Sequence, residues 1–255
     1  MKDEGRPANR EPSLTHKQAV AIALSDTTAE PEAQTSLVMQ RRQLYAESAE
    51  GLLADLAVAG FPGIEEVGDL RRRGLDYKAA VPILLRWLPS ARYLLLAEDI
   101  LRTLSVGFAK NLALPEFLQF FRQPPAAEDP IRPLTSEPAE EHLRWVIGNG
   151  LGIFAEPSVA DDLIGLARER GFGQARTQIV LALPKTKDDR VPGVLLSLLD
   201  DPTVAAFATE ALGKMRFAAA RPSIAELVDH SDENIRDQAK KALKRIDSED
   251  ARQRH

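Results

Sequence analysis

The chain of 255 residues contains no cysteine and few aromatic residues. The lack of cysteine excludes disulfide bonds, thiolate nucleophiles and cysteine-based zinc or iron–sulfur sites. It is compatible with a reducing compartment. Aromatic residues make up only 5% of the sequence, whereas hydrophobic residues make up 44%. The core must therefore be built mainly from leucine, alanine, valine and isoleucine, which suits closely spaced helices.

Basic excess and long apolar runs are also missing. The formal net charge is -5 at pH 7, whereas general nucleic-acid binders carry a basic excess that neutralises phosphates. No stretch approaches the ~18 apolar residues of a membrane-spanning helix. The polar N-terminal residues contain no apolar segment typical of a secretory signal. We therefore expect a soluble, cytoplasmic protein that binds neither nucleic acid nor membrane.

The most informative feature of the sequence is a repeated twelve-residue pattern. Five segments align when they are stacked on their first residues, which are Tyr93, Leu143, Ala175, Val204 and Ile235. The ninth position is leucine in every copy: Leu101, Leu151, Leu183, Leu212 and Leu243. Positions 1, 5, 8, 9 and 12 share one face of an α-helix. Small residues are common at positions 5 and 8, and they allow neighbouring helices to approach closely.

A second, shorter apolar segment lies between successive copies or just before the first. These segments span residues 79–88, 114–122, 159–168, 191–199 and 221–229. Proline lies near the start of four of them, where a missing N–H costs nothing. One hairpin cannot bury both of its apolar faces, so several must stack. The sequence therefore predicts an all-α solenoid, a right-handed α-α superhelix of about five helical hairpins.

The whole chain divides into four predicted segments. We expect a disordered arm, an N-terminal helical segment that packs on the solenoid, the repeats themselves and a flexible tail, over residues 1–33, 34–76, 77–247 and 248–255 respectively. Within the repeats, residues 123–138 contain five prolines. This proline-rich insertion is expected to be a surface loop that weakens the contact between the first repeat and the rest.

The repeat resembles the HEAT family, in the bacterial form called PBS-lyase HEAT-like. The resemblance is carried by VAAFATEALGKM at residues 204–215 and by residues 220–246, where an alanine-rich first helix ending in A-L-G-K is followed by an apolar second helix. Arg144, Arg176 and Arg236 match an arginine often found at the second position of the first helix, whereas the first and fourth copies lack it. The resemblance implies protein–protein interaction on a curved scaffold, in a family with few enzymes.

No catalytic, cofactor-binding or metal-binding motif is present in the sequence. The histidines, which are His16, His142, His230 and His255, have no metal-ligand spacing. No serine lies in a nucleophile elbow. The GNGLG sequence at residues 148–152 is similar to a phosphate-binding loop, but it lies inside a repeat helix and no Lys-Ser/Thr pair follows. Close helix packing is the favoured interpretation, so we expect no cofactor and no enzymatic activity.

Two groups of residues are candidates for partner binding. Arg144, Trp145 and Asn149 lie on one predicted helix beside the insertion, and Trp and Arg are enriched in binding hot spots. Packing of the tryptophan is the alternative. The second group consists of Asp162, Asp201 and Glu226. They are candidates for an acidic stripe that attracts a basic partner, with helix capping as the alternative.

Three functions remain open at this stage. The first is a monomeric, non-enzymatic scaffold or adaptor that binds another protein, such as a basic one. The second is a HEAT-like enzyme, either a DNA-alkylation-repair glycosylase or a phycobilin lyase. Such a glycosylase is expected to have a basic face with aromatic residues, whereas this chain is acidic and has two tryptophans. The third is a structural stabiliser of a larger assembly.

Overall fold

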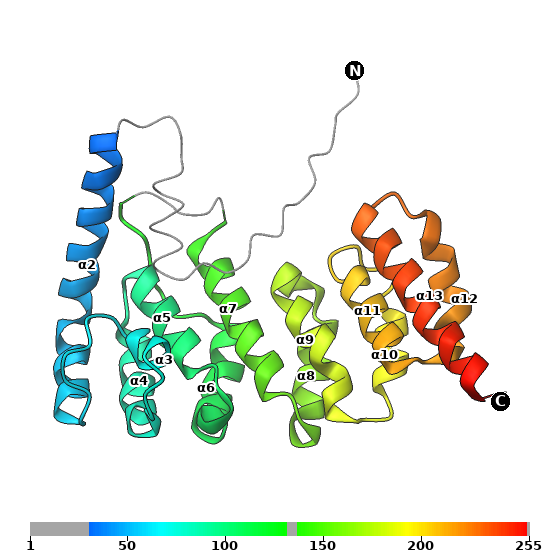
Figure 1. Ribbon diagram of the computed structural model, residues 1–255, viewed down its shortest axis with the longest axis horizontal. Helices are drawn as coiled ribbons and strands as arrows, with labels where there is room; N and C mark the ends of the chain where they lie inside the picture. The colour runs from blue at the N-terminus through cyan, green and yellow to red at the C-terminus, as the bar shows by residue number, and fades with distance from the viewer. Residues whose placement is uncertain (1–30, 132–136, 254–255) are drawn as a thin grey trace.

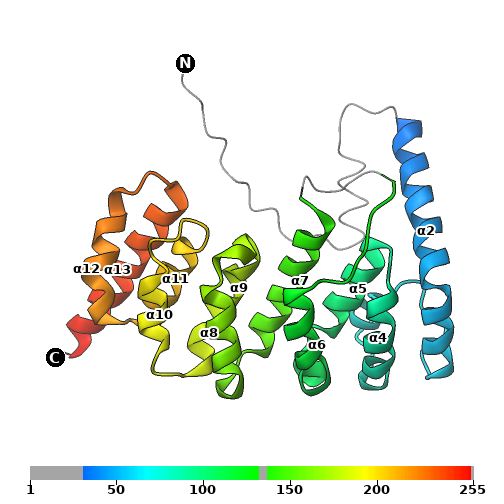
Figure 2. The ribbon, with the colours of Figure 1, turned by 180° about the vertical axis from the view of Figure 1, so that it is seen from behind.

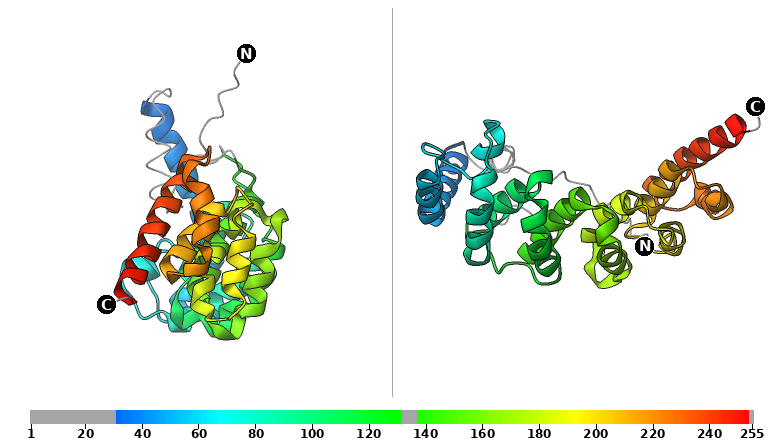
Figure 3. Two further views of the ribbon diagram at one scale, coloured as in Figure 1. Left: turned by 90° about the vertical axis from the view of Figure 1, so that its right-hand side faces the viewer. Right: turned by 90° about the horizontal axis from the view of Figure 1, so that it is seen from below.

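The computed structural model describes residues 31–131 and 137–253. Most of the expected N-terminal arm, with His16, and the end of the chain, with His255, lie outside the described residues. Within them the protein is an all-α, HEAT-like repeat solenoid with twelve α-helices and no strand. The helices stack in one elongated array that runs from α2 at one end to α13 at the other (Figure 1), and the array bends along its length (Figure 3). The predicted fold class is confirmed.

The repeats form two rows of helices, which Figures 1 and 2 show from opposite sides. The even row contains the short helices: α4 (Val81–Trp87), α6 (Lys110–Arg122), α8 (Ala160–Arg168), α10 (Val191–Ser197) and α12 (Arg221–Ala225). The odd row contains the helices of the twelve-residue pattern: α5 (Leu94–Leu104), α7 (Ala139–Phe154), α9 (Thr177–Ala182), α11 (Ala205–Met215) and α13 (Glu233–Gln253). Each even helix packs on the odd helix that follows it. The expected order within the hairpin is therefore wrong, because the alanine-rich helix comes second.

The leucines and small residues of the pattern build the core as predicted. Four of the five ninth-position leucines are fully buried, and Leu243 is partly buried against the same core. Neighbouring helices of the odd row touch through positions without a large side chain. A Cβ atom on Gly213 of α11 would lie 2.6 Å from the Cβ atom of Ala242 on α13. Gly148 of α7 likewise faces the carbonyl oxygen of Ala175 too closely for any side chain, which explains the GNGLG sequence by packing.

The N-terminal segment packs on the first repeat through a buried polar cluster. It consists of α2 (Pro31–Val58), a connection and the four-residue helix α3 (Asp69–Arg72). The hydroxyl of Tyr45 on α2 donates to the carboxylate of Asp99 on α5 over 2.8 Å. The backbone N–H of Gly68 donates to the same carboxylate over 2.7 Å. Burial, followed by the charge of Asp99, raises the pKa of Tyr45 well above its usual value, so this phenol stays neutral.

The proline-rich insertion differs from its prediction. Its described part, residues 123–131, packs on α2 and on the start of α5. The backbone N–H of Leu94 donates to the carbonyl of Glu128 over 2.9 Å. Arg41 of α2 pairs with Asp129 over 3.4 Å, and both side chains are almost fully buried. This part of the insertion therefore ties the N-terminal helices together, while residues 132–136 lie outside the described residues.

Two expected segment boundaries also change. Helix α2 begins at Pro31, so the last residues assigned to the disordered arm are helical. Helix α13 continues to Gln253, and most of the expected flexible tail is therefore helical as well. Both helices end the array, where each has a repeat on only one side. The apolar periodicity fades at both ends of the array, which is why sequence reasoning made both terminal helices too short.

Candidate functional site

The odd row presents a continuous set of side chains away from the core. They occupy positions 4, 7 and 11 of the twelve-residue pattern, a spacing of three to four residues that keeps them on one helix face. The partly or fully exposed members are Asn149, Ile153, Gln178, Leu181, Lys185, Phe207, Glu210, Lys214, Gln238, Lys241 and Arg245. We call this set the odd-face stripe. It runs without interruption from α7 to α13.

The same positions on α5 are covered by the chain itself. Leu96, Asp99 and Thr103 are buried, and the segment that carries α3 lies beside α5 (Figure 1). The guanidinium of Arg71 donates to the carboxylate of Asp99 over 2.8 Å and to the hydroxyl of Thr103 over 3.0 Å. The odd face can therefore hold a chain segment, and the part of it that remains open begins at α7.

The open stripe combines apolar, amide and charged side chains. Ile153 is 50% exposed, and Leu181 and Phe207 follow on the next two helices with partial exposure. Asn149 and Gln178 supply amides that donate and accept hydrogen bonds. A mixture of this kind, with apolar groups flanked by polar ones, is typical of protein–protein interfaces.

The six predicted partner-binding residues do not form one site. Trp145 and Asn149 lie partly exposed on α7, and Asn149 belongs to the stripe. Asp162 lies on α8, where its carboxylate is 3.9 Å from Arg122. Glu226 begins the short 3-10 helix Glu226–Asp229 that follows α12. These two acids lie on or directly after helices of the even row, away from the odd-face stripe, and an acidic stripe there stays a prediction.

Arg144 lies within the helix packing and is engaged by groups of the chain itself. Its guanidinium is buried, donates to the carbonyl of Phe121 over 3.0 Å and pairs with Glu140 and Glu141. Arg176 and Arg236, at the same repeat position, donate to the carbonyls of Ala167 and His230 over 2.9 and 2.7 Å. In each case the arginine donates to a carbonyl oxygen near the C-terminal end of the preceding short helix. The last carbonyl oxygens of a helix have no partner within that helix.

Asp201 is likewise buried within the solenoid. Its carboxylate accepts from the guanidinium of Arg176 over 2.8 Å and from the backbone N–H of Thr203 over 3.1 Å. Burial alone would raise the pKa of Asp201, but the hydrogen bond and the charge of Arg176 outweigh it, and the pKa is lowered. The carboxylate therefore stays ionised and joins two successive repeats. Asp201 is therefore buried in the described structure, and its role in partner binding stays a prediction.

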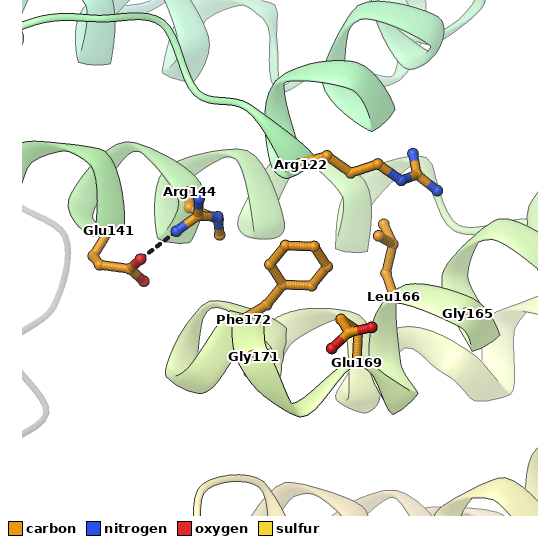
Figure 4. Close-up of a pocket in the computed structure, with 8 residues that line it drawn as sticks. All are labelled: Arg122, Glu141, Arg144, Gly165, Leu166, Glu169, Gly171 and Phe172. Atoms are coloured by element: carbon orange, nitrogen blue, oxygen red, sulfur yellow. Dashed lines mark hydrogen bonds and ion pairs between the residues drawn. The ribbon is translucent and has the colours of Figure 1, made fainter.

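A pocket of about 610 Å³ opens between α6, α7, α8 and the 3-10 helix Arg170–Arg176 (Figure 4). Its lining residues are Arg122, Glu141, Arg144, Gly165, Leu166, Glu169, Gly171 and Phe172. Phe172 packs edge-on against Phe121 at a centroid distance of 5.0 Å, and Arg144 lies 5.5 Å from the Phe172 centroid. The lining has no histidine or hydroxyl, and the pair of Glu141 and Arg144 is already closed. Phe172 and Arg144 therefore support the helix packing, and Arg122 and Glu169 complete the charged part of the lining.

Two further kinds of feature are absent from the described part of the chain. Residues 31–131 and 137–253 contain no group of three or more His, Asp or Glu side chains arranged to hold a metal ion. Among the helices the structure describes, none combines the length and the apolar character needed to cross a membrane.

Sequence reasoning missed most of the stripe. Gln178, Leu181 and Phe207 were not singled out because no single one of them has an unusual composition or motif. A signal was nevertheless present in the repeat alignment. Positions 4, 7 and 11 lie opposite the aligned apolar positions, and reading them across the copies gives the exposed face.

The comparisons with known proteins agree with this architecture. The family described as HEAT repeats matches residues 191–254, which include the last two hairpins, α10 with α11 and α12 with α13. No curated protein and no solved structure matches the chain. The two rows of stacked helices define a helical-repeat protein of the solenoid class. Its last two hairpins match the HEAT-repeat family, and the same hairpin architecture continues towards the N-terminus as far as α4.

Proposed function

We propose that this chain is a non-enzymatic protein-interaction module, a scaffold or adaptor, that binds another protein through the odd-face stripe. The proposal treats the free chain as a monomer and includes the likeness of its repeats to the bacterial PBS-lyase HEAT-like type and a cytoplasmic location. The observation that supports it best is the continuous stripe itself. Apolar side chains such as Ile153 and Leu181 are accessible to solvent on this face, and a partner that covers them would remove them from water.

The arrangement of the rest of the molecule agrees with a binding role. The conspicuous polar groups, including Arg144, Arg176 and Asp201, are engaged in holding helices and repeats together. The pocket beside Phe172 is lined by residues that pair with one another or pack. A DNA-alkylation-repair glycosylase would need aromatic residues for stacking beside an acidic group, and the open stripe has Phe207 as its single aromatic side chain.

Two exposed apolar residues allow a matched test. Ile153 of α7 is 50% exposed on the odd face, and Leu112 of α6 is 55% exposed in the even row. The tagged full-length chain is expressed in its native cell and its bound proteins are quantified by mass spectrometry. We expect Ile153→Asp to reduce recovery of a stoichiometric partner at least tenfold, because a central apolar contact is worth about 2 kcal/mol or more. Leu112→Asp should leave recovery unchanged.

Circular dichroism of both variants verifies that they fold. If Ile153→Asp and Leu112→Asp behave alike, the odd-face stripe is not the binding surface. Recovery of nucleic acid or of a pigment in place of a protein partner would favour the enzymatic alternative.

A further inference from the structure

The first repeat shows which chemistry the odd face uses to hold a chain segment. Asp99 occupies position 7 on α5, and the segment lying over it supplies a complementary cation, Arg71, at 2.8 Å. The same segment offers a backbone N–H, from Gly68, to that carboxylate. The face therefore recognises its intramolecular occupant by opposite charge together with backbone hydrogen bonding.

The charge of the stripe reverses on the three C-terminal odd helices. Position 11 is Lys185 after α9, Lys214 on α11 and Arg245 on α13, and position 7 of α13 is Lys241. The only carboxylate among the stripe residues of these helices is Glu210, which pairs with Lys214 over 2.9 Å. This cationic excess lies on a chain whose formal net charge is -5, so the composition conceals it.

The cations are regularly spaced across the helices. Packed helices lie about 8–10 Å apart, and α9, α11 and α13 are successive neighbours in the odd row. An extended chain advances roughly 3.3 Å per residue, so an extended segment crossing the row meets a new helix about every third residue. The Nζ atom of Lys185 also donates to the carbonyl of Gly152 over 2.8 Å, which holds this ammonium group at the edge of the stripe. Leu181 lies one helical turn before Lys185 and is partly exposed, so it offers an apolar contact beside this cation.

We propose that the C-terminal half of the odd-face stripe binds an acidic segment of another protein that crosses α9, α11 and α13 in extended form. The segment carries a carboxylate at about every third residue, with apolar residues between. This inference rests on the proposed function and names the chemistry of its partner. It replaces the expectation of a basic partner, which depended on Asp162, Asp201 and Glu226, none of which lies exposed on this face.

The test uses the full-length chain and two fluorescein-labelled peptides of about twelve residues. One has glutamate at every third position with leucine and alanine between, and the other has lysine in place of glutamate. Fluorescence anisotropy is measured at about 50 mM and about 300 mM NaCl, because screening weakens exposed charge pairs. We expect the acidic peptide to bind at least tenfold more tightly than the basic one, and to bind more weakly at the higher salt concentration.

A charge-matched pair of double variants locates the site. Lys185→Glu with Lys214→Glu reverses two stripe cations, whereas Lys78→Glu with Lys240→Glu makes the same change in net charge outside the stripe. We expect the first pair to weaken binding of the acidic peptide at least tenfold and the second pair to change it less than twofold. Equal effects of the two pairs, equal binding of the two peptides, or binding of neither peptide would overturn the inference. Tighter binding of an oligothymidylate than of the acidic peptide would do the same.

The two proposals fail in different ways. If Ile153→Asp abolishes recovery of the cellular partner while the Lys185→Glu, Lys214→Glu variant still recovers it fully, the odd face is the binding surface and its partner is not acidic. If neither change affects recovery, the proposed function fails as well.

Discussion

Replacing Asp201 by asparagine tests whether the buried pair with Arg176 joins the repeats. The side chains of Arg176 and Asp201 are 1% and 5% exposed, and their closest atoms are 2.8 Å apart. Asparagine keeps the size of the side chain and can still accept from the backbone N–H of Thr203. The change therefore removes the negative charge and little else. It leaves a buried guanidinium whose remaining partners include the carbonyls of Ala167 and Gly173.

The expected cost follows from the burial of the pair. Removing one partner of a buried ion pair typically costs about 3–5 kcal/mol, because the other charge stays desolvated. The two carbonyl acceptors offset part of this cost, so we expect the free energy of unfolding to fall by about 3 kcal/mol for Asp201→Asn. A second variant, Arg176→Met with Asp201→Asn, removes both charges. It should lose less than the sum of the two single changes, since no unpaired charge remains.

The adjacent residue provides the control. Asp200 pairs with Arg170 over 2.8 Å, but its side chain is 73% exposed, and such a pair contributes about 0–1 kcal/mol. Urea unfolding followed by circular dichroism measures both variants, with the m-value as a check that the same surface unfolds. If Asp201→Asn costs no more than Asp200→Asn, the buried pair does not hold the repeats together and the reasoning is refuted.

Two further changes test the packing of α7 and its contact with α5. Gly150→Ala should lower the free energy of unfolding by about 1–3 kcal/mol, because the new Cβ atom collides with Phe117. Gly165 has open space around it, so Gly165→Ala should raise the free energy of unfolding by up to about 1 kcal/mol. Urea unfolding measures both variants, and a shift of both in the same direction would contradict this reasoning. Burial by itself would raise the pKa of Glu98. The hydrogen bond with His142 and the charge of Arg102 lower it by more than burial raises it, so the pKa of Glu98 is lowered overall. Its contribution to stability is therefore present above the ordinary carboxyl pKa of about 4.3 and is lost as the pH falls through the lowered value. Glu98→Gln should flatten the loss of stability between about pH 5 and pH 2 in urea titrations, and an unchanged slope would count against the interaction.

The fate of the individual polar residues shows where sequence reasoning ends. Arg144 was predicted to bind a partner because arginine is enriched in binding hot spots, and Asp201 because a row of carboxylates attracts a basic partner. Each is buried because stacking brings a particular group against it, the carbonyl of Phe121 in one case and the guanidinium of Arg176 in the other. Those groups are 23 and 25 residues away in the chain, so no local pattern indicates the contact.

The open and covered parts of the odd face were decided in the same way. Positions 4, 7 and 11 have the same spacing in all five copies, and nothing in the pattern distinguishes α5 from α9. The segment around Gly68 and Arg71 covers the stripe on α5 and leaves it open from α7 onward. Net charge was misleading for a related reason, because a sum over the chain does not show that Lys185, Lys214, Lys241 and Arg245 share one face.

The amino-acid sequence alone determined the class of the protein, the number of its repeats and the residues of its core. Helix periodicity is a property of neighbouring residues, and the recurring leucine and small residues repeat it five times over. The tertiary structure decided the pairing of helices within each hairpin, the role of each buried charge and the extent of the accessible face. These features depend on contacts between residues distant in the chain, and such contacts exist only once the helices have stacked.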